Sequence, residues 1–149
     1  MGAKYDAGAV ALTAAVFRIR QPAYETNATT RLFGPNGKRQ NQGVELNVFG
    51  EPLKGVRLLG GVMYTDSELT DTTNGTYDGN RAPATPKYNV NLGAEWDVPG
   101  LEGLTLSSRG LYSSSQYLDA SNVKQIDAWT RLDVGARYGF KVDDKRITL

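Results

Sequence analysis

Polar and apolar side chains alternate, one residue at a time, along Lys87-Tyr88-Asn89-Val90-Asn91-Leu92-Gly93-Ala94-Glu95-Trp96-Asp97. Successive side chains of a β-strand point to opposite faces, so this stretch predicts a strand with one apolar face and one charged, polar face. The apolar face consists of Tyr88, Val90, Leu92, Ala94 and Trp96. The pattern therefore indicates a strand that lies between an apolar environment and an aqueous one.

The same alternation recurs along the chain, whereas no segment of convincing length has the period of a helix. Eight strand pieces can be marked: 1–6, 9–20, 40–50, 55–67, 86–97, 103–116, 125–141 and 145–149. The faces of 9–20 are ambiguous, because Val16 shares one face with Arg18 while Phe17 lies on the other. The chain as a whole is predicted to be all-β.

The connections between these pieces alternate between short turns and long loops. The short ones are 7–8, 51–54, 99–102 and 143–144, and the long ones are about 21–39, 68–85 and 117–124. The long ones are rich in Thr, Asn, Gly and Pro, which form turns and loops. Outer-membrane β-barrels have short periplasmic turns at one end and longer extracellular loops at the other. We therefore predict an antiparallel transmembrane β-barrel wall, made of about eight strand pieces of a larger up-and-down barrel.

Aromatic residues fall at the two ends of the apolar face. Tyr64, Tyr88 and Tyr112 lie toward the long loops, and Trp96, Tyr138 and Phe140 lie toward the short turns. Two such girdles are expected where amphipathic rings meet the two membrane interfaces. A soluble antiparallel barrel or sandwich would show the same alternation with its apolar face turned inward, and alternation alone leaves this alternative open.

Composition excludes several classes of function. Lys plus Arg number 17 and Asp plus Glu 16, so the charge balance gives no reason to expect nucleic acid as a partner. The chain has no cysteine and no histidine, which argues against thiol chemistry, catalytic triads and a metal site. We therefore expect that the chain is not an enzyme. The N-terminus lacks the apolar region of a signal peptide, so a mature or excised piece is expected.

Four stretches from Asn41 onward resemble the later barrel strands of TonB-dependent ferric-siderophore receptors. They are Asn41-Gln42-Gly43-Val44-Glu45-Leu46-Asn47-Val48, Gly60-Gly61-Val62-Met63-Tyr64-Thr65-Asp66-Ser67, Arg81-Ala82-Pro83-Ala84-Thr85-Pro86-Lys87-Tyr88-Asn89-Val90-Asn91-Leu92 and Trp129-Thr130-Arg131-Leu132-Asp133-Val134-Gly135-Ala136-Arg137-Tyr138. Their order and spacing are similar to this family along nearly the whole chain. The resemblance implies import of a ferric siderophore across the bacterial outer membrane with energy from the TonB system. It also implies that iron is carried as a substrate and that no cofactor is needed.

Receptors of this family have an N-terminal plug domain, an energy-coupling segment and a barrel of about 22 strands. We therefore expect residues 1–149 to be a partial receptor β-barrel domain without a plug. The expected partners are outer-membrane lipid, a ferric siderophore, the remainder of the receptor including the plug, and TonB through the N-terminal region. The alternative is a small self-contained β-barrel that binds a ligand, either soluble or in the outer membrane.

Two groups of residues are candidate functional positions. By resemblance, aromatics and cations at the extracellular mouth would contact the siderophore, namely Tyr24, Arg31, Phe33, Tyr77, Arg81, Tyr117 and Trp129. Aromatic faces and arginine suit a bulky, often anionic ferric chelate, although loop packing would also use such residues. The charges predicted to face the lumen are Glu45, Arg57, Lys87, Glu95, Arg109, Arg131, Asp133 and Arg137. They would either contact a plug and line a path, or form weak cross-strand ion pairs in a solvated lumen.

Overall fold

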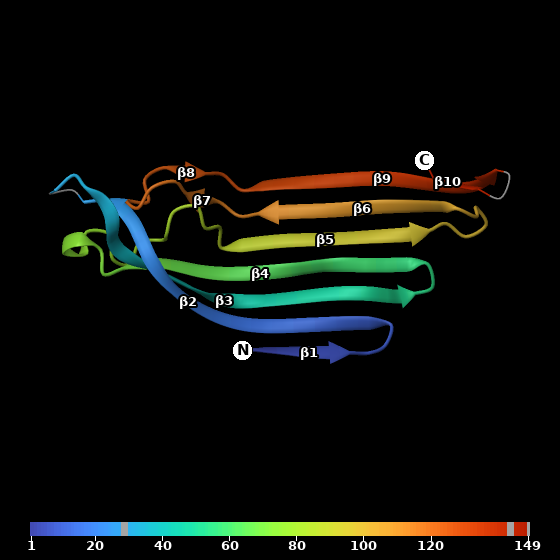
Figure 1. The fold of residues 1–149 in the computed structure, drawn as a ribbon, viewed down its shortest axis with the longest axis horizontal. Coiled ribbons are helices and arrows are strands. Elements are labelled where there is room, and N and C mark those ends of the chain that lie inside the picture. The colour runs from blue at the N-terminus through green and yellow to red at the C-terminus, as the bar shows by residue number, and fades with distance from the viewer. Residues whose placement is uncertain (28–29, 143–144, 149) are drawn as a thin grey trace.

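The computed structural model describes residues 1–27, 30–142 and 145–148, and most of them lie in β-strands. The elements are β1 Gly2–Asp6, β2 Val10–Thr26, β3 Phe33–Leu53, β4 Val56–Thr70, the short 3₁₀ helix η1 Thr73–Gly75, β5 Tyr88–Asp97, β6 Leu104–Ser113, β7 Gln116–Tyr117, β8 Gln125–Ile126, β9 Trp129–Val142 and β10 Lys145–Thr148. One antiparallel sheet has the order β1-β2-β3-β4-β5-β6-β9-β10, and β7 pairs with β8 in a separate two-stranded sheet (Figure 1). The predicted all-β antiparallel wall is confirmed.

The strand register sorts the side chains into two faces, because directly opposite residues of an antiparallel pair share a face. An apolar row crosses the sheet through Leu46, Val62, Val90 and Tyr112. The neighbouring row on the other face crosses it through Asn47, Gly61, Asn91 and Leu111. The alternation seen along each strand is therefore in step from strand to strand, and it gives the whole sheet one apolar and one polar face.

The register also assigns the faces of β2, which the sequence leaves ambiguous. Val16 lies opposite Val44, which lies opposite Tyr64, so Val16 belongs to the apolar face and Phe17 to the polar one. Arg18 shares the face of Val16, but it lies two residues further along β2 than the row that contains Val16, Val44 and Tyr64. The pattern of β2 is mixed because this strand extends past the apolar band.

The sheet has one layer, and the structure buries little against it (Figure 1). The buried apolar residues in the described part of the chain are Ala11, Ala23, Leu69 and Ala82. Large side chains on the apolar face stay open, for example Val134 at 77% exposed. Water does not favour an apolar face of this extent, but lipid does. Within the described residues, no helix combines the length and the apolar character that crossing a bilayer requires.

The two ends of the sheet differ as the sequence predicts. The connections β1–β2, β3–β4 and β5–β6 are short and lie together at one end, which we call the short-turn end (Figure 1). The connections β2–β3, β4–β5 and β6–β9 lie at the other, which we call the loop end (Figure 1). The predicted turn at 143–144 and residue 149 lie outside the described residues.

The prediction of a long loop over 21–39 is wrong, because β2 continues to Thr26 and β3 already begins at Phe33. The prolines and glycines that suggested a loop sit at a β-bulge instead. The pairing shifts between Ala23, which lies opposite Gly37, and Tyr24, which lies opposite Pro35. Turn-forming residues are tolerated in a strand at such bulges, where the ladder of hydrogen bonds is already interrupted.

The strands predicted over 103–116 and 125–141 are interrupted. The ladder between β6 and β9 ends where Ser113 lies opposite Trp129. Beyond it, β7 and β8 pair only with each other and the Ala84 amide donates to the Tyr117 carbonyl, which ties β7 to the β4–β5 loop. These residues therefore follow the loop end instead of extending the wall.

The alternative of a self-contained closed barrel is not supported. In the described residues β1 and β10 form opposite edges of the sheet and do not pair with each other. An isolated edge leaves backbone N–H and C=O groups without partners, which hydrocarbon does not tolerate. The eight strands form an open wall.

Candidate functional site

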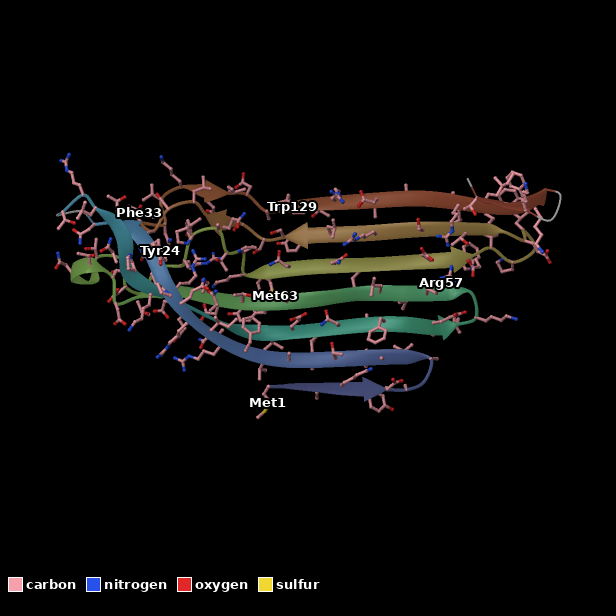
Figure 2. All side chains as sticks on the ribbon, in the orientation of Figure 1. Met1, Tyr24, Phe33, Arg57, Met63 and Trp129 are labelled. Atoms are coloured by element: carbon pink, nitrogen blue, oxygen red, sulfur yellow. The ribbon has the colours of Figure 1, made fainter. Side chains whose placement is uncertain are left out.

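A cavity of about 650 Å³ lies at the loop end, and we call it the mouth cavity. Its lining includes Tyr24, Phe33, Arg39, Leu69, Tyr77 and Leu118. The strands β2 and β3 bring Tyr24 and Phe33 to its rim, where their ring centroids lie 6.0 Å apart (Figure 2). These two side chains are 62% and 72% exposed, so their rings remain available for contact with a ligand.

A small apolar cluster supports the floor of the mouth cavity. Leu69 is 1% exposed and packs with Ala23 and Ala82, while Tyr77 and Ala120 cover the cluster in part. Its members come from β2, β4 and the loops that follow β4 and β6. The cluster therefore fixes these loops to the ends of the strands and gives the cavity a defined shape.

Hydrogen bonds join the β4–β5 loop to the β6–β9 loop. The Asn122 side chain accepts from the Arg81 amide and donates to the Arg81 carbonyl, both at 2.8 Å. The Asn80 side chain donates to the Ala120 carbonyl at 2.8 Å, and the Arg81 guanidinium lies 5.4 Å from the centre of the Tyr117 ring. The two loops thus behave as one unit beside the cavity.

The carboxylate of Asp78 shapes the β4–β5 loop. The Thr72 backbone N–H and the Thr72 hydroxyl both donate to Asp78 Oδ1, at 2.8 and 2.7 Å. These hydrogen bonds favour the ionised form and hold the pKa of the Asp78 carboxyl below its ordinary value. The turn around η1 therefore depends on a charged Asp78.

The structure brings some of the predicted mouth residues together and separates others. Tyr24, Phe33 and Tyr77 line the mouth cavity, whereas Arg81 and Tyr117 pair beside it. Arg31 lies in the tight connection between β2 and β3 with a φ of 56°, and it is not part of the lining. Trp129 lies opposite Ser113 on the polar face of the wall, at a separate hollow of about 480 Å³ (Figure 2).

Sequence reasoning missed Arg39, whose guanidinium donates to the Pro83 carbonyl at 3.1 Å and lines the mouth cavity. Arg39 lies at the end of the loop that the sequence predicts over 21–39. The register now places Arg39 opposite Leu69 on the polar face. The sequence carries no local signal for this role, because the bulge and the contact with Pro83 depend on distant segments.

The polar face carries an ion network at the short-turn end. Arg57 on β4 donates to Glu95 at 3.0 Å and to both oxygens of Asp97 at 2.7 and 2.8 Å. The Thr105 hydroxyl also donates to Asp97, and Arg137 lies 3.7 Å from Glu95. Asp97 was not among the predicted charges, yet it is the residue on which β4, β5 and β6 converge.

The other predicted lumen charges share the polar face with smaller networks. Arg109 donates to the Asn91 side chain at 2.9 Å and lies opposite Asp133 in the register. Asp133 accepts from Arg131 of its own strand at 2.9 Å. Glu45 accepts a hydrogen bond from the Asn47 side chain at 2.9 Å. The backbone carbonyl of Lys87 accepts from the Thr65 amide and so continues the hydrogen-bond ladder between β4 and β5 by one residue. The register therefore places these charges, apart from Lys87, on one face of the wall, and their position in a lumen stays a prediction.

Within the described ranges, no three His, Cys, Asp or Glu side chains are gathered so that they could hold a metal ion. An open antiparallel wall with an apolar outer face, a charged inner face and an aromatic cavity among its loops defines a class, that of outer-membrane β-barrel receptors.

The comparison with known proteins gives the family. Residues 1–149 match the family described as TonB dependent receptor-like, beta-barrel, and the chain belongs to that family. The ferrichrome receptor FcuA of Yersinia enterocolitica is 37% identical over 148 residues, covering 99% of this chain and 20% of that protein. The ferrichrome outer membrane transporter/phage receptor of Escherichia coli K12 is 35% identical over 105 residues, covering 68% of this chain and 14% of that protein.

A solved structure agrees with this assignment. The ferric preacinetobactin receptor BauA of Acinetobacter baumannii superposes with a TM-score of 0.87 and 41% identity, over 99% of this chain and 23% of that one. The chain thus spans about a fifth of the length of the relatives it matches. The family consists of outer-membrane receptors, so the predictions of an outer-membrane location and of a chain that is not an enzyme are confirmed.

Proposed function

We propose that this chain forms part of the barrel wall of a receptor that imports a ferric siderophore across the outer membrane. The names of its relatives support this, since two of them are receptors or transporters of ferrichrome and one is a receptor of ferric preacinetobactin. Iron would enter as the cargo of the chelate, and the proposal includes no resident cofactor.

The mouth cavity is the observation that carries the proposal. A ferric siderophore is bulky and presents flat or apolar surfaces around a charged centre, so a receptor needs exposed rings and a cation at its outer mouth. Tyr24 and Phe33 supply two adjacent exposed rings, and Arg39 supplies a cation in the same cavity. The volume of about 650 Å³ falls in the range of cavities that hold small-molecule ligands.

We also propose the remaining partners of the wall. The open edges of the sheet call for further barrel strands, and we propose that residues 1–149 are a partial barrel domain completed by the rest of the receptor. The charged polar face would then look onto a lumen occupied by a plug. Energy for import would come from TonB acting on the N-terminal part of the receptor.

The test uses the full-length receptor that contains this chain, expressed in a strain without other siderophore receptors. Ferrichrome and ferric preacinetobactin serve as probes, and binding and radio-iron uptake are measured for the wild type and for Y24A/F33A. We expect one probe to bind, and the double variant to bind it about tenfold more weakly, because two aromatic contacts are lost.

The matched control is L32A. Leu32 lies in the connection between β2 and β3, next to Phe33, and is 70% exposed, but it does not line the mouth cavity. L32A should bind like the wild type. Equal binding by Y24A/F33A and the wild type, or no binding of any ferric chelate by the folded receptor, would contradict the proposal.

A further inference from the structure

The chain contains two Asn-Gly pairs, Asn36-Gly37 and Asn74-Gly75, and the structure holds them in different ways. Asparagine is chemically labile, and it is most labile before glycine, because glycine has no side chain that shields its backbone nitrogen. That nitrogen can attack the side-chain amide of the asparagine. The reaction therefore depends on how freely the local backbone and the asparagine side chain can move.

The pair Asn36-Gly37 is fixed in the wall. It lies on β3 at the bulge, where Gly37 pairs with Ala23 of β2. Both residues are partly buried, and the Asn36 side chain donates to the Leu32 carbonyl at 3.4 Å. A Cβ at Gly37 would lie only 3.2 Å from the Thr72 side chain, so the glycine is closely covered as well. Strand pairing and packing thus hinder the approach of nitrogen and amide.

The pair Asn74-Gly75 lies in the open. It forms the end of η1 in the β4–β5 loop, at the loop end of the wall (Figure 1). Both residues are exposed, and the Asn74 side chain has no hydrogen-bond partner among the described residues. The Gly75 amide donates to the Thr72 carbonyl at 2.9 Å, in a single turn whose Asn74 has non-helical angles of φ 55° and ψ 22°. Release of this hydrogen bond frees the nitrogen.

We propose that Asn74 is a site of spontaneous deamidation. The backbone nitrogen of Gly75 attacks Asn74 Cγ, so that a new N–Cγ bond forms, the Cγ–Nδ2 bond breaks, and ammonia leaves with the proton of the backbone amide. Water then opens the resulting succinimide at either of its carbonyl groups and gives aspartate or isoaspartate. The step needs no oxidant or reductant. The inference goes beyond ligand import and does not depend on it.

The products alter a turn that supports the mouth cavity. Both place a new carboxylate near Asp78, whose Oδ2 lies 3.7 Å from the position of a Cβ on Gly75, and like charges repel. Isoaspartate also inserts an extra carbon atom into the backbone of the turn. Asp78 holds Thr72, and the Thr72 hydroxyl accepts from the Tyr77 amide at 3.0 Å. Because Tyr77 lines the mouth cavity, deamidation of Asn74 should loosen this side of the cavity.

The test ages the full-length receptor in detergent micelles at neutral and at mildly alkaline pH. Peptide mass spectrometry follows both Asn-Gly pairs in the same sample, and labelling by isoaspartyl methyltransferase identifies isoaspartate. We expect residue 74 to convert, and to convert faster at alkaline pH because the attacking nitrogen must lose its proton, while residue 36 stays asparagine. In receptor denatured with guanidinium chloride both pairs should convert at similar rates, which shows that the fold makes the difference.

The matched control is N74Q, because a glutamine side chain would have to close a larger ring and reacts slowly. Hydrogen exchange of the Tyr77 amide should be about tenfold faster in aged wild type than in aged N74Q, since one or two hydrogen bonds of the turn are lost. Equal conversion at residues 74 and 36 in the folded receptor would overturn the inference, as would an intact Asn74 at times when the denatured receptor has reacted. Equal exchange in the two aged proteins would overturn the effect on the cavity.

Discussion

Replacement of Leu69 by alanine tests whether the apolar cluster shapes the mouth cavity. Leu69 is the largest fully buried side chain among the described residues, at 1% exposed. Its backbone also fastens the β4–β5 loop, because its amide donates to the Asn80 carbonyl at 2.8 Å and its carbonyl accepts from Gly79 at 3.0 Å. The side chain and these two hydrogen bonds should therefore be lost together when the loop opens.

The magnitude follows from the size of the cluster. Leucine-to-alanine changes in full cores cost about 3–5 kcal/mol, of which part is the energy of the cavity that remains. Here the neighbours are mainly alanines and the partly buried Tyr77, so fewer contacts are lost and the loop can relax. We expect about 2–3 kcal/mol of local stability to disappear, which corresponds to a roughly 30- to 150-fold larger open population.

Hydrogen exchange of the full-length receptor in detergent measures this opening. In L69A, the amides of residues 79–82 and 84 should exchange roughly 30- to 150-fold faster, while those of β5 and β6 should keep the wild-type rate. L53A is the control, because Leu53 is 69% exposed at the short-turn end. Unchanged exchange in 79–84 would refute the role of the cluster, and faster exchange throughout the wall would refute its local character.

Two further predictions concern the loop and the wall. Because Thr72 donates to the ionised Asp78 and lowers its pKa, the stability of the loop should be complete above the ordinary value of 3.8 and be lost as the pH falls through the lowered pKa. Exchange of the Thr72 amide, corrected for intrinsic rates, should therefore accelerate from pH 5 to pH 3, whereas in D78N it should be fast at both. G43A should prevent folding, since a Cβ at this position would collide with the Tyr64 carbonyl oxygen. G34A on the same strand should fold, because no neighbour would lie closer than 4.0 Å to its Cβ. Loss of heat-modifiable gel migration in G34A, or its survival in G43A, would contradict this reasoning.

The wall could be predicted from the sequence because lipid imposes a simple rule on it. Every second residue of a spanning strand must be apolar, and this rule leaves a local signal in each strand, as in Val90 and Leu92. The face on which each side chain lies then follows without knowledge of distant contacts. Arg57 and Glu95 were assigned to one face by parity alone, and the register pairs them directly.

The loop end could not be predicted in the same way, because its order depends on contacts between distant segments. Pro35 and Gly37 read as a loop, yet they pair with β2 across a bulge that the sequence does not mark. The role of Arg39 likewise depends on Pro83, which lies far along the chain. Local turn chemistry identifies residues that permit a bend, but tertiary packing decides whether the bend becomes a loop or a bulge.

The two ends of the wall differ in what they leave available to a ligand. At the short-turn end Arg57 already donates to Glu95 and to both oxygens of Asp97, so an incoming anion would have to replace two carboxylates. At the loop end Tyr24 and Phe33 hold each other at 6.0 Å and remain exposed. Satisfied charges hold strands in register, whereas exposed rings gain contacts only when a ligand arrives. We therefore propose that recognition belongs to the mouth cavity and that the ion network serves the wall that supports it.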